Sequence, residues 1–193
     1  MKIELIYRDL FEYSGQVFID QMTNEHEYGL VDYADVMRTN ISNESSLGKQ
    51  MQTFIKKGEL IPDSLTFEVV KNSIETKKCE NILIKSFPKN FNQVELLTNY
   101  CSLNNIEIVR AWYMKGLNIM SNLEKVPKYS KMAKKYKSHE QIKLSSERSK
   151  KANENAIEQV SKYCEILIFE SESHGINYKM DKERIKETIH NNI

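Results

Sequence analysis

Short apolar runs alternate along this chain with longer stretches in which apolar residues recur every three or four positions. Runs such as "KIELI", "NILIK" and "IEIVRAW" have the length and the branched residues of buried strands. The stretches between them have helical spacing. Because parallel strands are joined by crossover connections that usually contain a helix, this order predicts an α/β domain with a mainly parallel sheet.

Local signals place several element boundaries. Gly58 is expected to end one helix, because glycine readily adopts the left-handed backbone found after many helices. Asp63 is expected to cap the next helix, and an earlier helix should start near Asp32 or Asp35. Near the end of the chain, residues 176–180 ("INYKM") are predicted as a strand that precedes a final helix.

The charge of the chain is balanced overall and uneven locally. With 28 basic and 27 acidic residues the net charge is +1, so no global field draws the protein to nucleic acid or membrane. Residues 125–151, however, contain ten basic and two acidic side chains, a local net charge of +8. This segment is either a solvated face or a contact surface for an acidic protein or an RNA backbone.

Several classes of site and location are not indicated. The three cysteines and four histidines are scattered, so no metal site is assigned. No apolar run reaches the roughly 18–20 residues that span a bilayer, and the N-terminus lacks the pattern of a signal peptide. We therefore expect an intracellular, cytoplasmic protein with no membrane contact.

Residues 7–16, "YRDLFEYSGQ", lie between the first predicted strand and the first predicted helix. In many nucleotide-binding proteins the turn at this place is rich in glycine, and its backbone N–H groups surround a phosphate. Here it contains one glycine and two tyrosines. The segment thus has the position of a phosphate loop between strand and helix, but not the glycines with which such a loop binds phosphate.

The centre of the chain resembles the adenylate kinase family of nucleoside monophosphate kinases. Residues 48–74 are similar to that family's helix, Gly-Glu-Leu-Val-Pro-Asp turn and next helix, and residues 81–97 are similar to its strand ending in Asp-Gly-Phe-Pro-Arg and the helix after it. The resemblance implies a single domain over residues 1–193 with a P-loop NTPase fold, in which a mainly parallel five-stranded sheet forms a three-layer α/β/α core. It also implies a small helical subdomain near residues 33–76 and a lid-like segment over residues 125–151.

The resemblance places residues 7–16 on the family's phosphate-binding loop, Gly-x-Pro-Gly-x-Gly-Lys-Gly-Thr. The glycines of such a loop let backbone N–H groups close around phosphate, its lysine supplies a charge, and its hydroxyl binds Mg²⁺. We expect a different turn here, filled by the aromatic side chains of Tyr7, Phe11 and Tyr13, with a carboxylate where triphosphate should lie. Lys85 replaces the acidic residue that helps to organise Mg²⁺. The residues at the glycine positions are Tyr7, Leu10 and Glu12, with Tyr13 at the lysine and Gly15 at the hydroxyl position.

The mononucleotide side is closer to the family pattern. The resemblance implies that Arg38 holds the monophosphate and that Gln93 reads adenine, but lysine at position 89 cannot reproduce the bidentate grip of the family's arginine. Tyr33 and Ser86 also depart from the pattern, and Lys137, His139 and Glu140 do so in the lid. The residues of this weakened, AMP-like pocket are Arg38, Leu60, Ile61, Thr66, Lys89, Gln93 and Arg148. Each also has an ordinary explanation as a surface, core or turn residue.

Together these features predict a catalytically inactive, adenylate kinase-like protein that acts as a binding or structural subunit, or accessory factor, of a larger assembly. No catalytic residue, metal or cofactor is assigned; AMP binding is possible, whereas ATP with Mg²⁺ is disfavoured. One alternative is an AMP-binding sensor without phosphoryl transfer. Others are a residual nucleoside monophosphate kinase that converts ATP and AMP to two ADP, and an RNA-associated protein that binds through residues 125–151.

Overall fold

A computed structural model of the chain describes residues 1–10, 14–116, 138–170 and 178–193. Strands and helices alternate in it as the apolar pattern predicts. Within these residues no helix is both long enough and apolar enough to cross a membrane. The elements in chain order are β1 (Lys2–Arg8), α1 (Ser14–Asn24), β2 (Gly29–Asp32), α2 (Tyr33–Ser42), α3 (Ser46–Lys57), α4 (Asp63–Glu75), β3 (Asn81–Lys85), α5 (Phe91–Leu103), β4 (Glu107–Lys115), α6 (His139–Val160), β5 (Glu165–Glu170) and α7 (Tyr178–His190).

The five strands form one sheet in the order β2-β3-β1-β4-β5, and every pairing is parallel. The predicted parallel sheet is therefore confirmed. Side chains alternate between its faces: Ile3, Leu5 and Tyr7 of β1 join the apolar cluster on one face, and Ile6 joins the cluster on the other. Both faces of the sheet must then be covered by helices.

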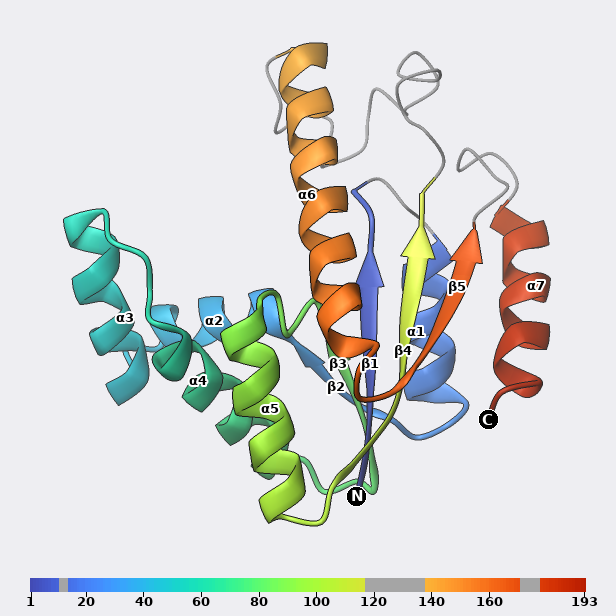
Figure 1. The fold of residues 1–193 in the computed structure, drawn as a ribbon, viewed down its shortest axis with the longest axis horizontal. Helices are drawn as coiled ribbons and strands as arrows, with labels where there is room; N and C mark the ends of the chain where they lie inside the picture. Colours follow the sequence, from blue (N-terminus) through green and yellow to red (C-terminus); the bar gives the residue numbers. More distant parts are fainter. Residues whose placement is uncertain (11–13, 117–137, 171–177) are drawn as a thin grey trace.

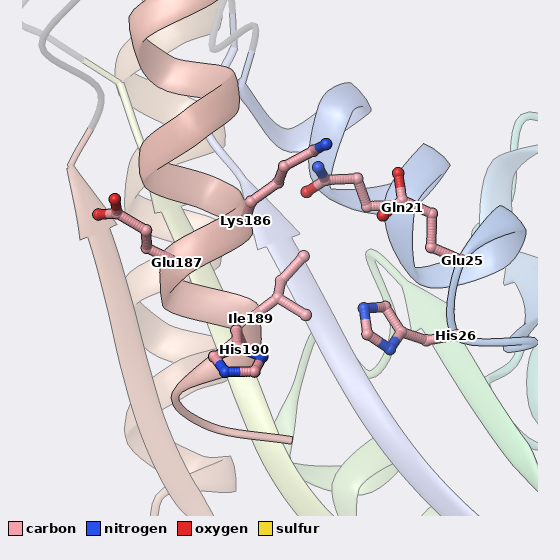
Figure 2. A pocket seen from close by; sticks show the side chains of 7 residues that line it. All are labelled: Gln21, Glu25, His26, Lys186, Glu187, Ile189 and His190. Atoms are coloured by element: carbon pink, nitrogen blue, oxygen red, sulfur yellow. The ribbon is translucent and has the colours of Figure 1, made fainter.

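Helices α1 and α7 cover one face of the sheet (Figure 1). Phe18 and Met22 of α1 pack there with Trp112 of β4 and with Ile185 and Ile189 of α7. The rings of Phe18 and Trp112 lie 4.7 Å apart between centroids. A pocket lies between the C-terminal ends of the two helices and is lined mostly by polar side chains, including those of Glu25 and His26 just after α1 (Figure 2).

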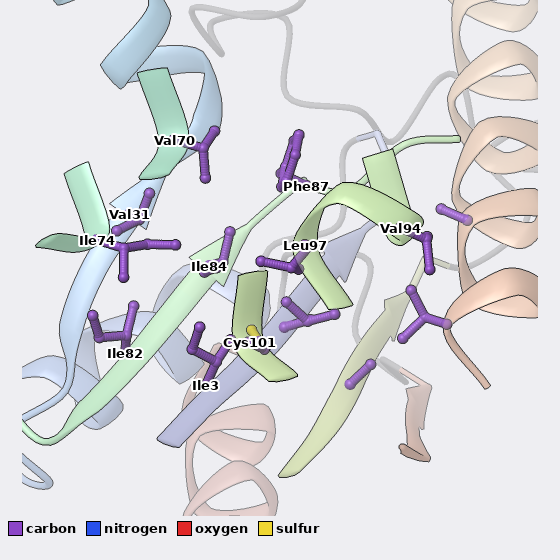
Figure 3. Packing of buried hydrophobic residues seen from close by; sticks show 14 of the residues in the cluster. Ile3, Val31, Val70, Ile74, Ile82, Ile84, Phe87, Val94, Leu97 and Cys101 are labelled. Atoms are coloured by element: carbon purple, nitrogen blue, oxygen red, sulfur yellow. The ribbon is translucent and has the colours of Figure 1, made fainter. Parts of the chain in front are cut away.

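Helices α4, α5 and α6 contribute to the cluster on the opposite face, which completes the three-layer α/β/α architecture. Figure 3 shows Val94 and Leu97 of α5 above the sheet, with Ile84 of β3 and with Val70 and Ile74 of α4. All five side chains are at most 2% exposed. Burial on both faces explains why the strands read as continuous apolar runs.

Helices α2, α3 and α4 lie together at the β2 edge of the sheet (Figure 1). A small cluster of their own, formed by Met37, Met51 and Val69, joins them. These helices occupy residues within the range predicted for a helical subdomain, near residues 33–76.

Most predicted boundaries agree with the structure. Gly58 ends α3 with φ of 69°, the left-handed conformation expected of a glycine at this place. Asp32 caps α2, and its carboxylate accepts two backbone N–H groups. The prediction for α4 was wrong by one residue, because Pro62 is the capping residue and Asp63 is already helical.

The predicted strand over residues 176–180 was wrong where the structure describes it. Tyr178–Met180 belong to α7, so the helix begins before Asp181, and β5 is the last strand among the described residues. Alternating and branched residues favour a strand only weakly, and packing of a helix against a sheet can override that preference. Ile185 and Ile189 supply this packing in α7.

Candidate functional site

The candidate site lies at the carboxyl end of the sheet, where β1 and β3 lead in opposite directions. The chain leaves β1 toward α1 on one face and leaves β3 toward α5 on the other. In open parallel sheets a ligand commonly binds in the crevice formed by such a divergence. The residues that follow these two strands therefore decide what the site can hold.

Tyr7, which the resemblance places at the first glycine position of the loop, lies near the end of β1. Its ring is only 1% exposed, and its hydroxyl donates a hydrogen bond of 2.9 Å to the carbonyl oxygen of Pro88, which follows β3. Burial raises the pKa of this phenol well above its ordinary value. An aromatic side chain thus bridges the two diverging segments from within the core.

Asp9 places a buried carboxylate directly after β1. Its oxygens accept hydrogen bonds from the Tyr113 hydroxyl at 2.8 Å, the Gly116 backbone N–H at 3.2 Å and the Asn153 side-chain amide at 3.2 Å. Asp9 is 6% exposed, and burial together with this hydrogen bond raises the pKa of Tyr113. The donors that surround Asp9 come from β4, from the residue after it and from α6. They are neutral groups that hold an internal anion.

The other predicted loop residues fall in three places. Leu10 is half-buried in the turn after β1, and Gly15 is buried in the first turn of α1. Phe11, Glu12 and Tyr13 lie outside the described residues. The predicted carboxylate at position 12 therefore remains a prediction, whereas the structure supplies one at Asp9.

Lys85, at the end of β3, forms an ion pair with Asp32 at the end of β2. Its Nζ lies 2.7 Å from Asp32 Oδ2, and the two side chains are 20% and 21% exposed. Burial acts to raise the pKa of Asp32, but Lys85 and two backbone N–H groups outweigh it and hold the pKa below its ordinary value. Next to Lys85, Ser86 has φ of 60°. The backbone at Ser86 thus has a left-handed conformation that favours glycine, although the residue there is a serine.

Replacing Lys85 by methionine is expected to lower the free energy of unfolding by about 1–3 kcal/mol near neutral pH, because Asp32 loses a partly buried partner. The lowered pKa of Asp32 stabilises the native state above the ordinary pKa of aspartate, about 3.9, and this contribution disappears as pH falls through the native value. The cost of Lys85→Met should therefore shrink in acid. Urea unfolding at several pH values measures it.

Lys71→Met is the matched control, because Lys71 makes an exposed pair with Glu68 within α4. It should change stability by less than about 1 kcal/mol at every pH. Equal costs for the two substitutions would show that the Lys85–Asp32 pair contributes no more than a surface pair.

Aromatic side chains pack around Tyr33, a position that departs from the family pattern of the mononucleotide pocket. The Tyr33 ring stacks on Phe87, with centroids 5.7 Å apart, and Phe87 stacks on Phe67 at 6.5 Å. Lys89 Nζ lies 4.7 Å from the centroid of the Tyr33 ring, in a cation–π contact. Tyr33 and Lys89 are thus engaged with each other.

Gln93, the predicted reader of adenine, uses its side chain inside the protein. Its amide nitrogen donates to Asp63 at 2.6 Å, and its amide oxygen accepts the backbone N–H of Lys89 at 2.9 Å. It is 5% exposed. These bonds tie the start of α5 to the start of α4 and use both polar atoms of the amide.

The remaining predicted pocket residues differ in burial and in their contacts. Arg38 is exposed and forms an ion pair with Asp35 at 3.4 Å in the same helix. Leu60 is 94% exposed, while Thr66 is 2% exposed within α4. Ile61 packs against the small cluster of α2, α3 and α4, and Arg148 is exposed on α6.

Sequence reasoning missed Asp9, Asn153 and the role of Asp63. Asp9 had a usable signal, since it is an acidic residue directly after a buried strand. Asn153 had none, because it lies more than 140 positions away from its partners Arg8 and Asp9. Asp63 was expected only to cap a helix, whereas in the structure it accepts hydrogen bonds from Asn90, Asn92 and Gln93.

The sheet order, the diverging strands and the helices at the β2 edge define a protein of the P-loop nucleoside monophosphate kinase class. The adenylate kinase family model matches residues 17–163, and the chain belongs to that family. It is 37% identical over 98 residues to an adenylate kinase of Borrelia garinii subsp. bavariensis. This alignment covers 50% of this chain and 46% of the relative. It is also 37% identical over 71 residues to one of Clostridium tetani, or 36% and 33% of the two chains. The matched part spans less than half of either relative.

Proposed function

We propose that this chain is a catalytically inactive member of the adenylate kinase family that serves as a binding or structural subunit of a larger assembly. The observation that carries the proposal is the Asp9 carboxylate at the carboxyl end of β1. It accepts hydrogen bonds from Tyr113, Gly116 and Asn153. These donors lie at the edge of the sheet where this class of fold binds phosphate, and Asp9 already occupies them.

Phosphoryl transfer depends on positioning the phosphates and neutralising their charge. A phosphate brought to this edge meets a negative carboxylate and competes with it for neutral donors. Position 85 has a lysine where Mg²⁺ would need a carboxylate, and this lysine forms an ion pair with the carboxylate of Asp32. The described residues therefore fit ATP with Mg²⁺ poorly.

The acceptor side supports the same proposal. An adenine that took over the hydrogen bonds of the Gln93 amide would displace Asp63 or the Lys89 backbone; only the amide's second N–H and second lone pair remain, on a side chain that is 5% exposed. A monophosphate held by Lys89 would have to draw it from the Tyr33 ring. Each exchange costs an existing contact, so AMP recognition is opposed by bonds within the protein.

The first half of α6 is the surface that we propose for docking. Residues 138–151 are the described part of the basic segment, and residues 125–137 lie outside the description. The exposed basic side chains of this part are Lys143, Arg148, Lys150 and Lys151, with Leu144 45% exposed among them. A protein partner with an acidic surface and an apolar contact fits this combination, since exposed apolar side chains add affinity that charge alone does not.

A coupled assay with ATP, AMP and Mg²⁺ should show turnover at least about 10⁴-fold below that of an active relative assayed in parallel, because several phosphate-binding groups are absent together. Titration calorimetry should show no saturable binding of ATP or AMP at millimolar concentration. Mg²⁺-dependent turnover that is lost in Arg148→Ala but kept in Lys143→Ala would establish a residual kinase. AMP binding that Arg38→Ala abolishes would establish the sensor.

The docking half of the proposal is tested by chemical cross-linking of the tagged protein in its native cells. A specific protein partner should be lost when the four basic residues of α6 are changed to glutamate, and kept when Lys56 and Lys57 of α3 are changed in the same way. Material that disappears on nuclease treatment, with steep salt dependence, would favour RNA instead.

A further inference from the structure

The two edges of the sheet differ in how they are protected. At one edge, β2 has four residues, and none of them is exposed. At the other edge, β5 has six residues with the sequence EILIFE, of which Glu165, Ile168 and Glu170 are exposed. Lysine, proline or a bulge commonly keeps an edge strand from pairing with another chain. β5 contains neither lysine nor proline, and its pairing with β4 has no shift in register. Its edge is therefore open to a further strand.

The register shows which backbone groups of β5 face away from the sheet. The Asp9 N–H donates to the Met114 carbonyl across β1 and β4, so the peptide groups of Met114 face β1 and those of Tyr113 face β5. Tyr113 lies opposite Ile168, and in a parallel pair it bonds to the residues on either side of Ile168. The N–H and C=O groups of Ile168, and of the residues two positions away on each side, therefore face outward.

These outward-facing groups are mostly unpaired. The Glu170 carbonyl accepts a hydrogen bond from Arg184 at 3.4 Å, whereas the outward groups of Ile166 and Ile168 have no hydrogen-bond partner among the described residues. The side chain of Ile168 is 59% exposed. Strand addition pairs such backbone groups and covers apolar side chains beside them.

We propose that β5 pairs antiparallel with β5 of a second copy of this chain, across a two-fold axis at Ile168. In this register Ile168 lies opposite its own counterpart, and Ile166 lies opposite Glu170 of the second copy. All three outward-facing residues then form hydrogen-bonded pairs. The proposal does not rest on the proposed function, because β5 shares no residue with the Asp9 site or with the docking surface on α6.

The side chains favour a second copy over an unrelated strand. The residue on the axis is the exposed apolar side chain of β5, and it meets itself in a symmetric pair. On the other face Leu167 lies opposite Phe169 of the second copy, which extends the apolar cluster that both residues join. Like charges directly opposite each other would destabilise the pairing. No two carboxylates of β5 are opposed in this register, and Glu170 already forms an ion pair with Lys115 at 2.7 Å.

Sedimentation equilibrium of the purified chain over a dilution series should show a monomer–dimer equilibrium. Ile168→Lys should weaken self-association by about tenfold or more, because it places two like charges opposite each other on the axis. Leu103→Lys is the matched control, since Leu103 is 84% exposed on α5, and it should leave self-association unchanged. Ile168→Pro, which removes an outward N–H that an unpaired edge strand does not use, should also weaken it.

Ile168→Cys tests the register. The two Cα atoms at the axis should lie about 5.5 Å apart, so a short bifunctional thiol reagent should link two copies of this variant. Leu103→Cys should give no more cross-linked dimer than the wild type, which contains the native Cys79, Cys101 and Cys164.

Circular dichroism verifies that each variant is folded. A chain that stays monomeric up to about millimolar concentration would overturn the proposal, as would a dimer that both Ile168→Lys and Ile168→Pro leave intact. Equal cross-linking of Ile168→Cys and Leu103→Cys would overturn it as well. A monomer that pairs only with a strand of another protein would contradict it and give the edge a different partner.

Discussion

Changing Tyr7 to glycine, the residue that the family's loop has at this position, is expected to lower the free energy of unfolding by about 4–5 kcal/mol. The ring is buried in the core, and its removal leaves a cavity between β1 and the segment after β3. The backbone there is an ordinary strand, so glycine adds flexibility to the unfolded chain and removes packing. Restoring the loop residue is therefore expected to damage the protein.

Urea unfolding followed by circular dichroism measures this effect, with Tyr7→Phe as the control. Phenylalanine keeps the ring and removes only the donor to the Pro88 carbonyl, so it should cost about 1–2 kcal/mol. If Tyr7→Gly unfolded at the same urea concentration as wild type, residue 7 would have to lie in a loop outside the core.

Changing Glu4 to alanine is expected to cost about 3–5 kcal/mol, because it leaves a partly buried cation without its counter-ion and two donors without their acceptor. Glu4 is 2% exposed. Its carboxylate accepts the Tyr28 hydroxyl at 2.9 Å and the Trp112 indole N–H, and it lies 3.5 Å from Arg110 Nε. Burial, followed by the charge of Glu4, raises the pKa of Tyr28.

Thermal and urea unfolding of Glu4→Ala, Glu4→Gln and Glu107→Ala should rank the three variants. Glutamine keeps the shape and one acceptor oxygen, so its cost should be smaller than that of alanine. Glu107 is exposed at the start of β4, and its loss should change stability by less than about 0.5 kcal/mol. If Glu4→Ala were as stable as Glu107→Ala, the contacts of Glu4 with Tyr28, Trp112 and Arg110 would make no net contribution to the free energy of unfolding.

The fold could be predicted because its signals are local and repeated. Each buried parallel strand reads as an apolar run, and Gly58 and Asp32 mark helix ends through backbone conformation and hydrogen bonding that depend on few neighbours. The exceptions are at the C-terminal end, where the edge strand β5 was missed and residues 178–180 were assigned to a strand. There, the packing of α7 on the sheet outweighed the local preference.

The candidate site could be predicted less well. The family pattern located the positions of Tyr7, Lys85 and Gln93 along the chain, but it did not indicate what their side chains contact. Tyr7 is a core residue, as expected of the aromatic side chains in this stretch, but its bond to Pro88 was not predicted. Lys85 proved to be the partner of Asp32, and Gln93 the partner of Asp63. Each contact joins residues that are at least 30 positions apart.

By itself the sequence determined the alternation of strands and helices, the parallel sheet and the loss of glycines after the first strand, because these depend on residue type and short-range spacing. Only the tertiary structure decided that Asp9 supplies the buried anion and that the side chain of Gln93 is bonded to Asp63. The physical reason is that hydrogen bonds and ion pairs between distant segments depend on distances of a few ångströms, which folding sets and no local pattern records.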